Sequence, residues 1–369
     1  AGLRIALAVH CRICAADPKI QLGFPEVTLG LLPGAGGVTK LTRLLGLQAA
    51  FPYLIEGKLM KPADAAKLGL LQGLAKDAAN AMSMARDWIK ANPSPVQPWD
   101  AKDYRMPGGN PNSPAVSQML AVAPAMLTEK TRGLYPAPEA ILSAMVEGAY
   151  VDFDTAMRIE SRYLARIAVG QVAKNMITAF FFNLTAIKSG ASRPKDVPKW
   201  KPAKVGILGA GMMGGGIAYA TATRGIPCVL RDVSLEAAQK GKSYTETVLT
   251  KRKAALDPLN LITPTANNDD LAGCDLIIEA VFEKRDLKAQ VTKESEPKLV
   301  ANGIFASNTS TLPITGLATA PAKQDNLIGR HFVSRVDRKP LVQIIKGATT
   351  ACEPVSRAHN QVHALDTSP

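Results

Sequence analysis

Residues 205–216 read Val-Gly-Ile-Leu-Gly-Ala-Gly-Met-Met-Gly-Gly-Gly, and this stretch decides the fold of the second half of the chain. It contains most of an apolar strand expected at 204–208, and the chain then turns through clustered glycines. A helical pattern follows at 217–224, and a second apolar strand follows at 227–230. Strand, glycine-rich turn, helix and strand in this order predict a βαβ unit of an α/β sheet.

Three glycines and one aspartate of this unit point to a dinucleotide. In such units the first glycine makes the tight turn, the second lets the backbone approach the pyrophosphate, and the third lets helix and strand pack closely. Here they are Gly209, Gly211 and Gly214, and the helix presents its N-terminus to the anion. Asp232 stands 18 residues beyond Gly214, where a carboxylate accepts hydrogen bonds from a ribose 2′-hydroxyl and repels a 2′-phosphate. The pattern predicts NAD rather than NADP, a preference that the neighbouring Arg231 weakens.

Length and composition are those of a globular protein. The 369 residues leave room for two or three domains, and 47% are hydrophobic and 20% charged. The longest apolar run, at 176–187, is too short to span a bilayer. No signal peptide is evident, and five scattered cysteines indicate reduced thiols, as in a bacterial cytoplasm or an organelle matrix. Cys11 and Cys14 form a CxxC without a second ligand pair, so we expect small buried residues and no metal site there.

The formal net charge of +13 admits nucleic acid, a membrane surface or an anionic small molecule as partner. Its richest stretch, 188–204, holds prolines and a glycine that mark a linker. Aromatic residues make up only 5% and are not interleaved with the basic ones, which argues against a stacking surface for single strands. We therefore expect a phosphorylated substrate or cofactor and no nucleic acid.

Three regions follow one another along the chain. Residues 1–95 include a glycine-rich turn at 33–37 that opens a helix. Residues 96–200 begin as a connector rich in Pro, Gly and Asn and continue as helices toward the basic linker. Residues 201–369 hold the nucleotide-binding pattern. We expect α/β architecture with a helical region between the two ends.

Two further segments give expectations about single residues. At 154–169 the apolar residues fall near one helical face, and the charged residues, Glu160 among them, fall mostly on the other. At 346–369 an apolar helix pattern is missing, so we expect an irregular tail that contains His359 and His363.

At two places the residues resemble known enzyme families. Leu22-Gly-Phe-Pro-Glu-Val-Thr-Leu-Gly-Leu-Leu-Pro-Gly-Ala-Gly-Gly37 closely resembles the second half of the crotonase, or enoyl-CoA hydratase, module. The region from Lys204 onward, with Ser307-Asn-Thr-Ser310 and His331-Phe-Val-Ser334, resembles the 3-hydroxyacyl-CoA dehydrogenase module. Both in this order, joined by helices, look like the multifunctional α-subunit of the fatty-acid β-oxidation complex.

The resemblance implies hydration of 2-enoyl-CoA followed by NAD-linked oxidation of 3-hydroxyacyl-CoA to 3-oxoacyl-CoA. It implies a partial crotonase module, a helical linker and a Rossmann domain, with acyl-CoA thioesters as substrates. A thiolase subunit is a candidate partner that the sequence leaves open. Relative to the family, the first half of the crotonase module and the helical domain after the Rossmann domain are missing, so we expect an internal fragment.

The hydratase chemistry needs one group to activate water and another to handle the α-carbon proton, and two carboxylates divide these roles. Glu26 matches the family's second glutamate, which the resemblance makes an acid/base. Its partner is expected 22 residues upstream, and Arg4 stands there. Because an arginine stays protonated, it cannot act as a general base, and we expect hydration to be strongly impaired.

The dehydrogenase chemistry needs a base that takes the proton of the 3-hydroxyl group. His331 follows an apolar strand at 327–329, and it matches the family's catalytic base. Ser310 stands 21 residues earlier, where the family has a hydroxyl group that contacts the substrate. The family orients its histidine with a glutamate 12 positions onward, and this chain has Gln343. A neutral amide accepts the imidazole hydrogen bond but does not offset imidazolium charge, so we expect reduced dehydrogenation.

The cofactor positions depart less from the family. The resemblance places the backbone of Met213 at the pyrophosphate turn. An apolar strand at 276–283 is expected to continue toward a helix. By resemblance the residues on the nicotinamide side are Val281, Phe282, Glu283 and, nearby, Lys288, with Ser310 also close to the cofactor.

Two rival functions stay open. The chain is either a bifunctional β-oxidation enzyme or a catalytically inactive NAD-binding or scaffold fragment, as Arg4 and Gln343 suggest. A dehydrogenase of small 3-hydroxy acids shares the Rossmann start, but it does not need the crotonase signature at 33–37.

Overall fold

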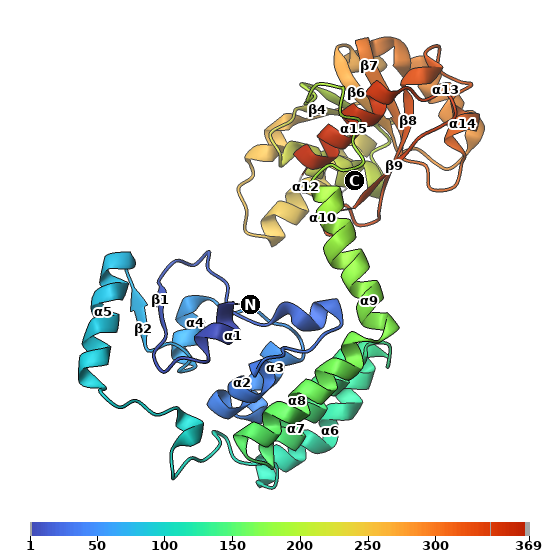
Figure 1. Ribbon diagram of the computed structural model, residues 1–369. Coiled ribbons are helices and arrows are strands. Elements are labelled where there is room, and N and C mark those ends of the chain that lie inside the picture. Colours follow the sequence, from blue (N-terminus) through green and yellow to red (C-terminus); the bar gives the residue numbers. More distant parts are fainter. Residues whose placement is uncertain (1, 340, 366–369) are drawn as a thin grey trace. The chain divides into compact units, whose positions relative to one another are not determined.

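Two compact units, Ala1–Asn183 and Leu184–Pro369, make up the protein in this computed structural model, which describes residues 2–339 and 341–365 (Figure 1). Each unit has a hydrophobic core of its own. Within the described residues, no helix is both long and apolar enough to cross a membrane. The finer division at 1–95, 96–200 and 201–369 stays a prediction.

The first unit is mainly helical, with one short parallel pair of strands in which Ile13 lies opposite Gly73. Its core lies between α2, α3 and α7, where Val38, Leu41 and Ile141 are fully buried. The elements are α1 (Gly2–Ala6), β1 (Ile13–Ala15), η1 (Pro25–Leu29), α2 (Gly37–Leu45), α3 (Leu47–Leu54), α4 (Pro62–Lys67), β2 (Gly73–Ala75), α5 (Ala78–Ala91), η2 (Pro98–Asp100), α6 (Pro114–Thr131), α7 (Pro136–Ala149), α8 (Phe153–Ala168), α9 (Gln171–Ile177) and the π-helical η3 (Thr178–Asn183).

Glu160 on α8 differs from the sequence expectation, because it is buried rather than on a solvent face. Its carboxylate accepts hydrogen bonds from the backbone N–H of Gly36 at 2.7 Å and of Thr39 at 2.9 Å, and from the Thr39 hydroxyl at 3.0 Å. These donors belong to the N-terminal turn of α2, where N–H groups lack partners within the helix. A carboxylate at this position also suits the helix dipole. Helix α8 thus caps α2 with a residue 124 positions beyond Gly36.

The second unit is built on one seven-stranded sheet in the order β5-β4-β3-β6-β7-β8-β9. The first six strands in this order, from β5 across to β8, run parallel to one another. The last strand, β9, pairs antiparallel with β8. The elements are α10 (Leu184–Lys188), β3 (Val205–Leu208), α11 (Met212–Ala222), β4 (Cys228–Arg231), α12 (Leu235–Lys251), η4 (Asp257–Leu261), β5 (Ile262–Thr265), η5 (Asn268–Leu271), β6 (Cys274–Glu279), α13 (Arg285–Ser295), η6 (Glu296–Lys298), β7 (Leu299–Ser307), α14 (Ile314–Leu317), η7 (Gln324–Asn326), β8 (Leu327–Phe332), β9 (Val342–Ile345) and α15 (Cys352–Ala364).

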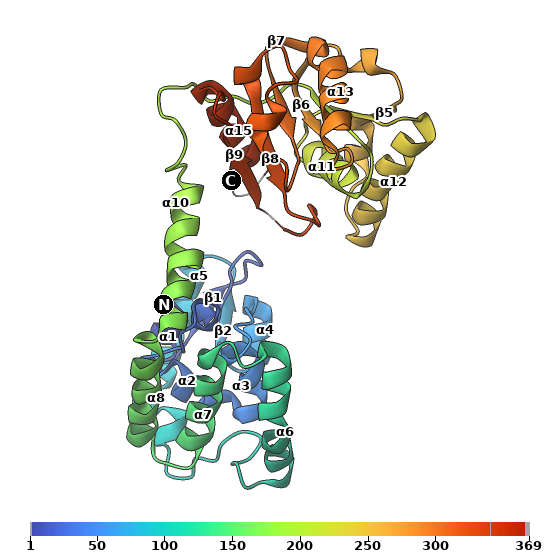
Figure 2. The same ribbon diagram turned by 90° about the vertical axis from the view of Figure 1, so that its right-hand side faces the viewer.

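Alternate residues of the central strands pack on opposite faces of this sheet, as the pleat requires. Ile207 and Ile278 belong to the cluster that α11 and α15 cover, whereas Ile277 and Phe305 belong to the cluster that α13 and α14 cover (Figure 1 and Figure 2). Helices on both faces of a parallel sheet define a Rossmann-type fold, as predicted. The strand order reverses between β3 and β6, so the ligand crevice of this fold lies at their carboxyl ends.

Two expectations about this unit were wrong. The tail is not irregular, because α15 forms over Cys352–Ala364 and buries Ala358 and Val362 against the sheet. The strand expected at 276–283 ends at Glu279, and the chain leaves the sheet there. The residues after Glu279 are therefore free to form part of the crevice.

Candidate functional site

Two glycines of the first βαβ unit, Gly209 and Gly214, are required by close backbone contacts. Gly209 has φ +89°, and a Cβ there would lie 2.8 Å from the Ala280 carbonyl oxygen at the end of β6. A Cβ at Gly214 would lie 1.7 Å from the Gly209 carbonyl oxygen. A Cβ at Gly211, in contrast, would meet nothing within 4 Å. The turn is therefore tight where helix meets strand and open at Gly211.

The N-terminus of α11 is accessible to an anion. Its N-cap residue is Gly211, which has no side chain that could cap the N–H groups of the first turn. Met212 is exposed, Met213 is half-buried, and a Cβ at Gly211 would meet nothing within 4 Å, so there is open space at this end of the helix, whose first N–H groups have no partner within the helix. The first turn of α11 fits a pyrophosphate by backbone hydrogen bonding and by the helix dipole.

Asp232 lies directly after β4, beside the same turn. Its Oδ2 accepts a hydrogen bond from the Ala210 N–H at 2.6 Å, and its Oδ1 accepts one from the Val233 N–H at 2.6 Å. Each carboxylate oxygen retains a lone pair, because it can accept more than one hydrogen bond. The side chain is therefore held in place and still fits a ribose diol.

Across the crevice, the segment after β6 carries a charged cluster. Lys288 on α13 is 2% exposed, and its ammonium lies 2.9 Å and 3.1 Å from the two carboxylate oxygens of Glu279. It also lies 3.2 Å from Oε2 of Glu283. Lys288 is thus buried behind the more exposed Glu283. Its predicted contact with a cofactor stays a prediction. Phe282 is 82% exposed between the two glutamates, and Val281 is half-buried.

Glu283 also holds the loop that follows β7. Its Oε1 accepts hydrogen bonds from the Thr309 hydroxyl at 2.6 Å and from the backbone N–H groups of Ser310 and Thr311, both at 3.0 Å. Burial acts to raise the pKa of Glu283, but these hydrogen bonds and the charge of Lys288 outweigh it and hold the pKa at about 2. An ionised Glu283 therefore fixes the backbone that carries Ser310.

His331 and Gln343 face each other across the antiparallel pair β8–β9. His331 Nδ1 lies 2.6 Å from Gln343 Oε1. Because an amide oxygen only accepts, Nδ1 carries the proton and Nε2 keeps a free lone pair. Asn308 links this pair to the Ser310 loop, since its Oδ1 accepts a hydrogen bond from the Phe332 N–H at 2.9 Å. A proton acceptor and a serine hydroxyl thus stand at the carboxyl edge of adjacent strands.

The first unit brings Glu26 and position 4 together. Arg4 Nε lies 3.6 Å from Oε1 of Glu26, and Arg4 Nη1 donates a hydrogen bond to the Gly34 carbonyl oxygen at 3.4 Å. Oε2 of Glu26 is buried and has no hydrogen-bond partner among the described atoms. Two carboxylates at these positions would form a close pair, but here one carboxylate pairs with a guanidinium group.

Family models match both ends of the chain. Residues 204–369 match 3-hydroxyacyl-CoA dehydrogenase, NAD binding domain, and residues 1–99 match enoyl-CoA hydratase/isomerase. The chain joins a hydratase segment to a dehydrogenase NAD-binding domain. The cofactor of this hydratase–dehydrogenase fusion is NAD, as the glycine turn and Asp232 predicted.

Solved structures of dehydrogenases are similar to the NAD-binding part of the fusion. (S)-3-hydroxybutyryl-CoA dehydrogenase PaaH1 from Ralstonia eutropha is 34% identical, with 46% of this chain and 62% of that chain covered and a TM-score of 0.44. FadB2 from M. tuberculosis is 27% identical, covering 46% and 63%, with a TM-score of 0.44. 3-Hydroxybutyryl-CoA dehydrogenase from Escherichia coli is 25% identical, covering 46% and 38%, with a TM-score of 0.44. The fusion thus spans less than two thirds of the length of each of these proteins.

Sequence reasoning missed Glu279 and Asn308, which position the predicted site residues. Glu279 ends an apolar strand, and a carboxylate in such a run is a usable signal because a buried charge needs a partner. Asn308 lies in the Ser307–Ser310 motif, but its role depends on one side-chain hydrogen bond to the neighbouring strand, which the motif does not indicate.

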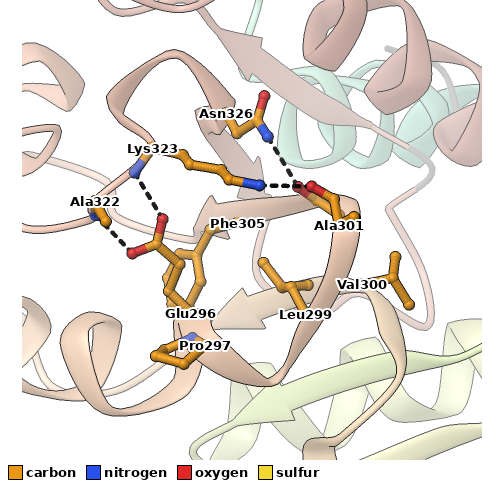
Figure 3. Close-up of a pocket in the computed structure, with 10 residues that line it drawn as sticks. Glu296, Pro297, Leu299, Val300, Ala301, Phe305, Ala322, Lys323 and Asn326 are labelled. Carbon is orange, nitrogen blue, oxygen red and sulfur yellow. Dashed lines mark hydrogen bonds between the residues drawn. The ribbon is translucent and has the colours of Figure 1, made fainter.

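A hollow of about 310 Å³ lies at the opposite, amino edge of β7 and β8 (Figure 3). The carboxylate of Glu296 accepts hydrogen bonds from the N–H groups of Ala322 at 2.6 Å and Lys323 at 2.9 Å. The Lys323 ammonium donates to the Ala301 carbonyl oxygen at 2.6 Å. Its charged groups are engaged with the protein itself, and we assign this hollow no ligand.

Proposed function

We propose that residues 204–369 oxidise 3-hydroxyacyl-CoA thioesters to 3-oxoacyl-CoA with NAD⁺. The observation that carries the proposal is the His331–Gln343 pair, whose free Nε2 lies at the edge of the sheet that also carries the glycine turn and the Ser310 loop. The family match to the NAD-binding domain supports the reaction class. The identity of the substrate and the turnover of this chain are both part of the proposal.

In this proposal His331 is the general base. Its Nε2 takes the proton of the 3-hydroxyl group while the C3–H bond breaks, and the Ser310 hydroxyl orients the same oxygen. NAD⁺, when bound, accepts the hydride that leaves C3. Gln343 keeps the imidazole in the tautomer with Nε2 unprotonated. The 3-oxo product and a protonated His331 result.

The neutral Gln343 makes this base weaker than a carboxylate partner would. When Nε2 takes the proton, the imidazolium gains a hydrogen bond from Nδ1 to an amide but no opposite charge. We therefore propose slow rather than absent dehydrogenation.

For the first unit we propose ancestry in hydration with little remaining activity. Glu26 retains the position of an acid/base residue, but the guanidinium group of Arg4 lies 3.6 Å from it. A permanently protonated group takes no proton from water. Hydration through a carboxylate pair is therefore impaired.

NADH formation tests the proposal directly. The complete chain is incubated with NAD⁺ and either a 3-hydroxyacyl-CoA or the matching free 3-hydroxy acid, and NADH is followed by its absorbance. We expect NADH only with the thioester. Equal rates with the free acid would favour a dehydrogenase of small hydroxy acids, and NAD binding without any NADH would favour a non-catalytic module.

The cellular setting is also proposed. The free thiols of Cys11, Cys14, Cys228, Cys274 and Cys352 support a reducing compartment, either a bacterial cytoplasm or an organelle matrix. A role in fatty-acid β-oxidation follows if the substrate is an acyl-CoA. A thiolase subunit stays a predicted partner.

A further inference from the structure

Three charged side chains lie together beneath the β6 side of the crevice. The Lys288 ammonium lies 2.9 Å from Glu279 Oε2 and 3.2 Å from Glu283 Oε2. Glu279 is 1% exposed and Lys288 is 2% exposed, whereas the Glu283 side chain is 35% exposed. We refer to Glu279, Lys288 and Glu283 as the charge triad. Its two inner members are shielded from water and its outer member opens to the crevice.

The triad has one more negative than positive charge. Glu279 receives hydrogen bonds from Lys288 on both oxygens, from the Ser307 hydroxyl on Oε1, and from the Val281 N–H on Oε2 at 3.4 Å. Lys288 and the Val281 N–H can only donate and therefore favour an ionised Glu279, whereas the Ser307 hydroxyl can donate or accept. Burial raises the pKa of Glu279, and the Lys288 charge opposes that effect. Among the described residues, Lys288 is the cation that forms an ion pair with either glutamate, so one carboxylate charge is left over.

The triad lies where the second half of a dinucleotide would extend. The strand order reverses between β3 and β6, and Asp232 stands on the β4 side of that point. A cofactor whose pyrophosphate is bound at α11 and whose adenine ribose is bound at Asp232 extends in the other direction over the end of β6. Phe282 and the exposed carboxylate of Glu283 lie at that end of β6.

We propose that the charge triad raises the affinity for the oxidised cofactor relative to the reduced one, through the net negative charge that its two carboxylates and one ammonium group carry together. The nicotinamide ring is cationic in NAD⁺ and neutral in NADH. A net negative charge behind the crevice therefore stabilises the first and leaves the second nearly unaffected. The inference rests on the proposed NAD-dependent function and names how the same site selects the oxidation state.

The test compares dissociation constants rather than rates. Calorimetry gives the Kd of NAD⁺ and of NADH for the complete chain and for Glu279→Gln, which removes the charge at nearly constant size. We expect the ratio Kd(NAD⁺)/Kd(NADH) to rise on the order of threefold to tenfold in Glu279→Gln. Glu294→Gln is the matched control, because it makes the same change at an exposed position of α13, and the ratio stays unchanged.

A second variant covers a folding failure of Glu279→Gln. Glu283→Gln removes the outer charge, and it is expected to raise the ratio at least as much, even if both affinities fall. An unchanged ratio in every folded triad variant that binds both cofactors would overturn the inference. Failure of the wild-type chain to bind either cofactor would instead overturn the proposed function.

Discussion

At position 343 a neutral amide accepts the hydrogen bond of His331 Nδ1 at 2.6 Å. Replacing it by a carboxylate in Gln343→Glu keeps the geometry and supplies the charge that stabilises an imidazolium. We expect kcat/KM for NADH formation to rise on the order of 10-fold to 100-fold. Steady-state kinetics with a 3-hydroxyacyl-CoA measure it. Gln343→Met is the control without charge or acceptor, and a Gln343→Glu chain no faster than wild type would remove this account of the pair.

Arg4 offers a comparable exchange in the first unit. Arg4→Glu replaces the guanidinium group 3.6 Å from Glu26 with the carboxylate that hydration needs. We expect the rate of hydration of a 2-enoyl-CoA to rise by about 100-fold, which is the lower end of the rate enhancement that one general acid or base contributes. The loss of enoyl thioester absorbance reports it. Arg4→Gln removes the cation without adding a base, so a gain of equal size in Arg4→Gln would show that charge removal alone is responsible.

At the scale of elements, Glu160 joins α8 to the N-terminus of α2. Its two oxygens serve different N–H donors, Gly36 and Thr39, so a glutamine with one acceptor oxygen satisfies only one of them. We expect Glu160→Gln to lower the free energy of unfolding by about 1–3 kcal/mol, the usual cost of a buried unsatisfied group. Urea denaturation followed by circular dichroism measures it. The exposed Glu129→Gln on α6 is the control for general charge loss, and equal effects of the two substitutions would contradict the cap.

The loop at 309–311 gives a pH dependence. Glu283 has its pKa lowered to about 2 by its hydrogen bonds and by Lys288, against the opposing effect of burial. A carboxylate with a depressed pKa contributes stability that is fully present above its unfolded pKa of about 4.3 and is lost as the pH falls toward the folded value. The stability difference between wild type and Glu283→Gln should therefore be largest at neutral pH and shrink below about pH 4. A difference that grew on acidification would contradict an ionised Glu283.

Local patterns predicted the elements better than they predicted the contacts between them. The alternation of strand, glycine turn, helix and strand located β3 and β4 to within one residue at each end, whereas α11 begins at Met212, five residues before the helix expected at 217–224. The end of β6 and the helix α15 were missed, since both depend on packing against the sheet. Glu160 was placed on the wrong face because its partner lies 124 residues away along the chain.

The same limit applies to the candidate site. Gly214 was predictable because its close contact, with the Gly209 carbonyl oxygen, is made within one βαβ unit, whereas Gly209 was predicted from the turn motif although its close contact is with Ala280 after β6. His331 and Gln343 face each other because of the register between β8 and β9. From the sequence, their spacing of 12 residues indicated this pairing only through the resemblance. The charge triad could not be predicted from the sequence. The sequence around Lys288 reads as an ordinary helix start and does not indicate that Lys288 is buried.

At the scale of the whole molecule, two units with separate cores should respond separately to the cofactor. A ligand that binds one native unit stabilises that unit by about 2.7 kcal/mol at a hundredfold excess over Kd. We expect NAD⁺ to raise one of two thermal transitions in calorimetry and to leave the other unchanged. NADP⁺ should shift it less, because Asp232 repels a 2′-phosphate. A shift of both transitions by NAD⁺ would show that the units unfold together.

His331→Gln tests whether His331 is the base of the NAD-dependent oxidation. Its kcat/KM for NADH formation from a 3-hydroxyacyl-CoA is compared with that of the wild-type chain, together with the Kd of NAD⁺. We expect a loss of about 100-fold or more in kcat/KM with an unchanged Kd of NAD⁺. NADH formation at the wild-type rate in His331→Gln would contradict it.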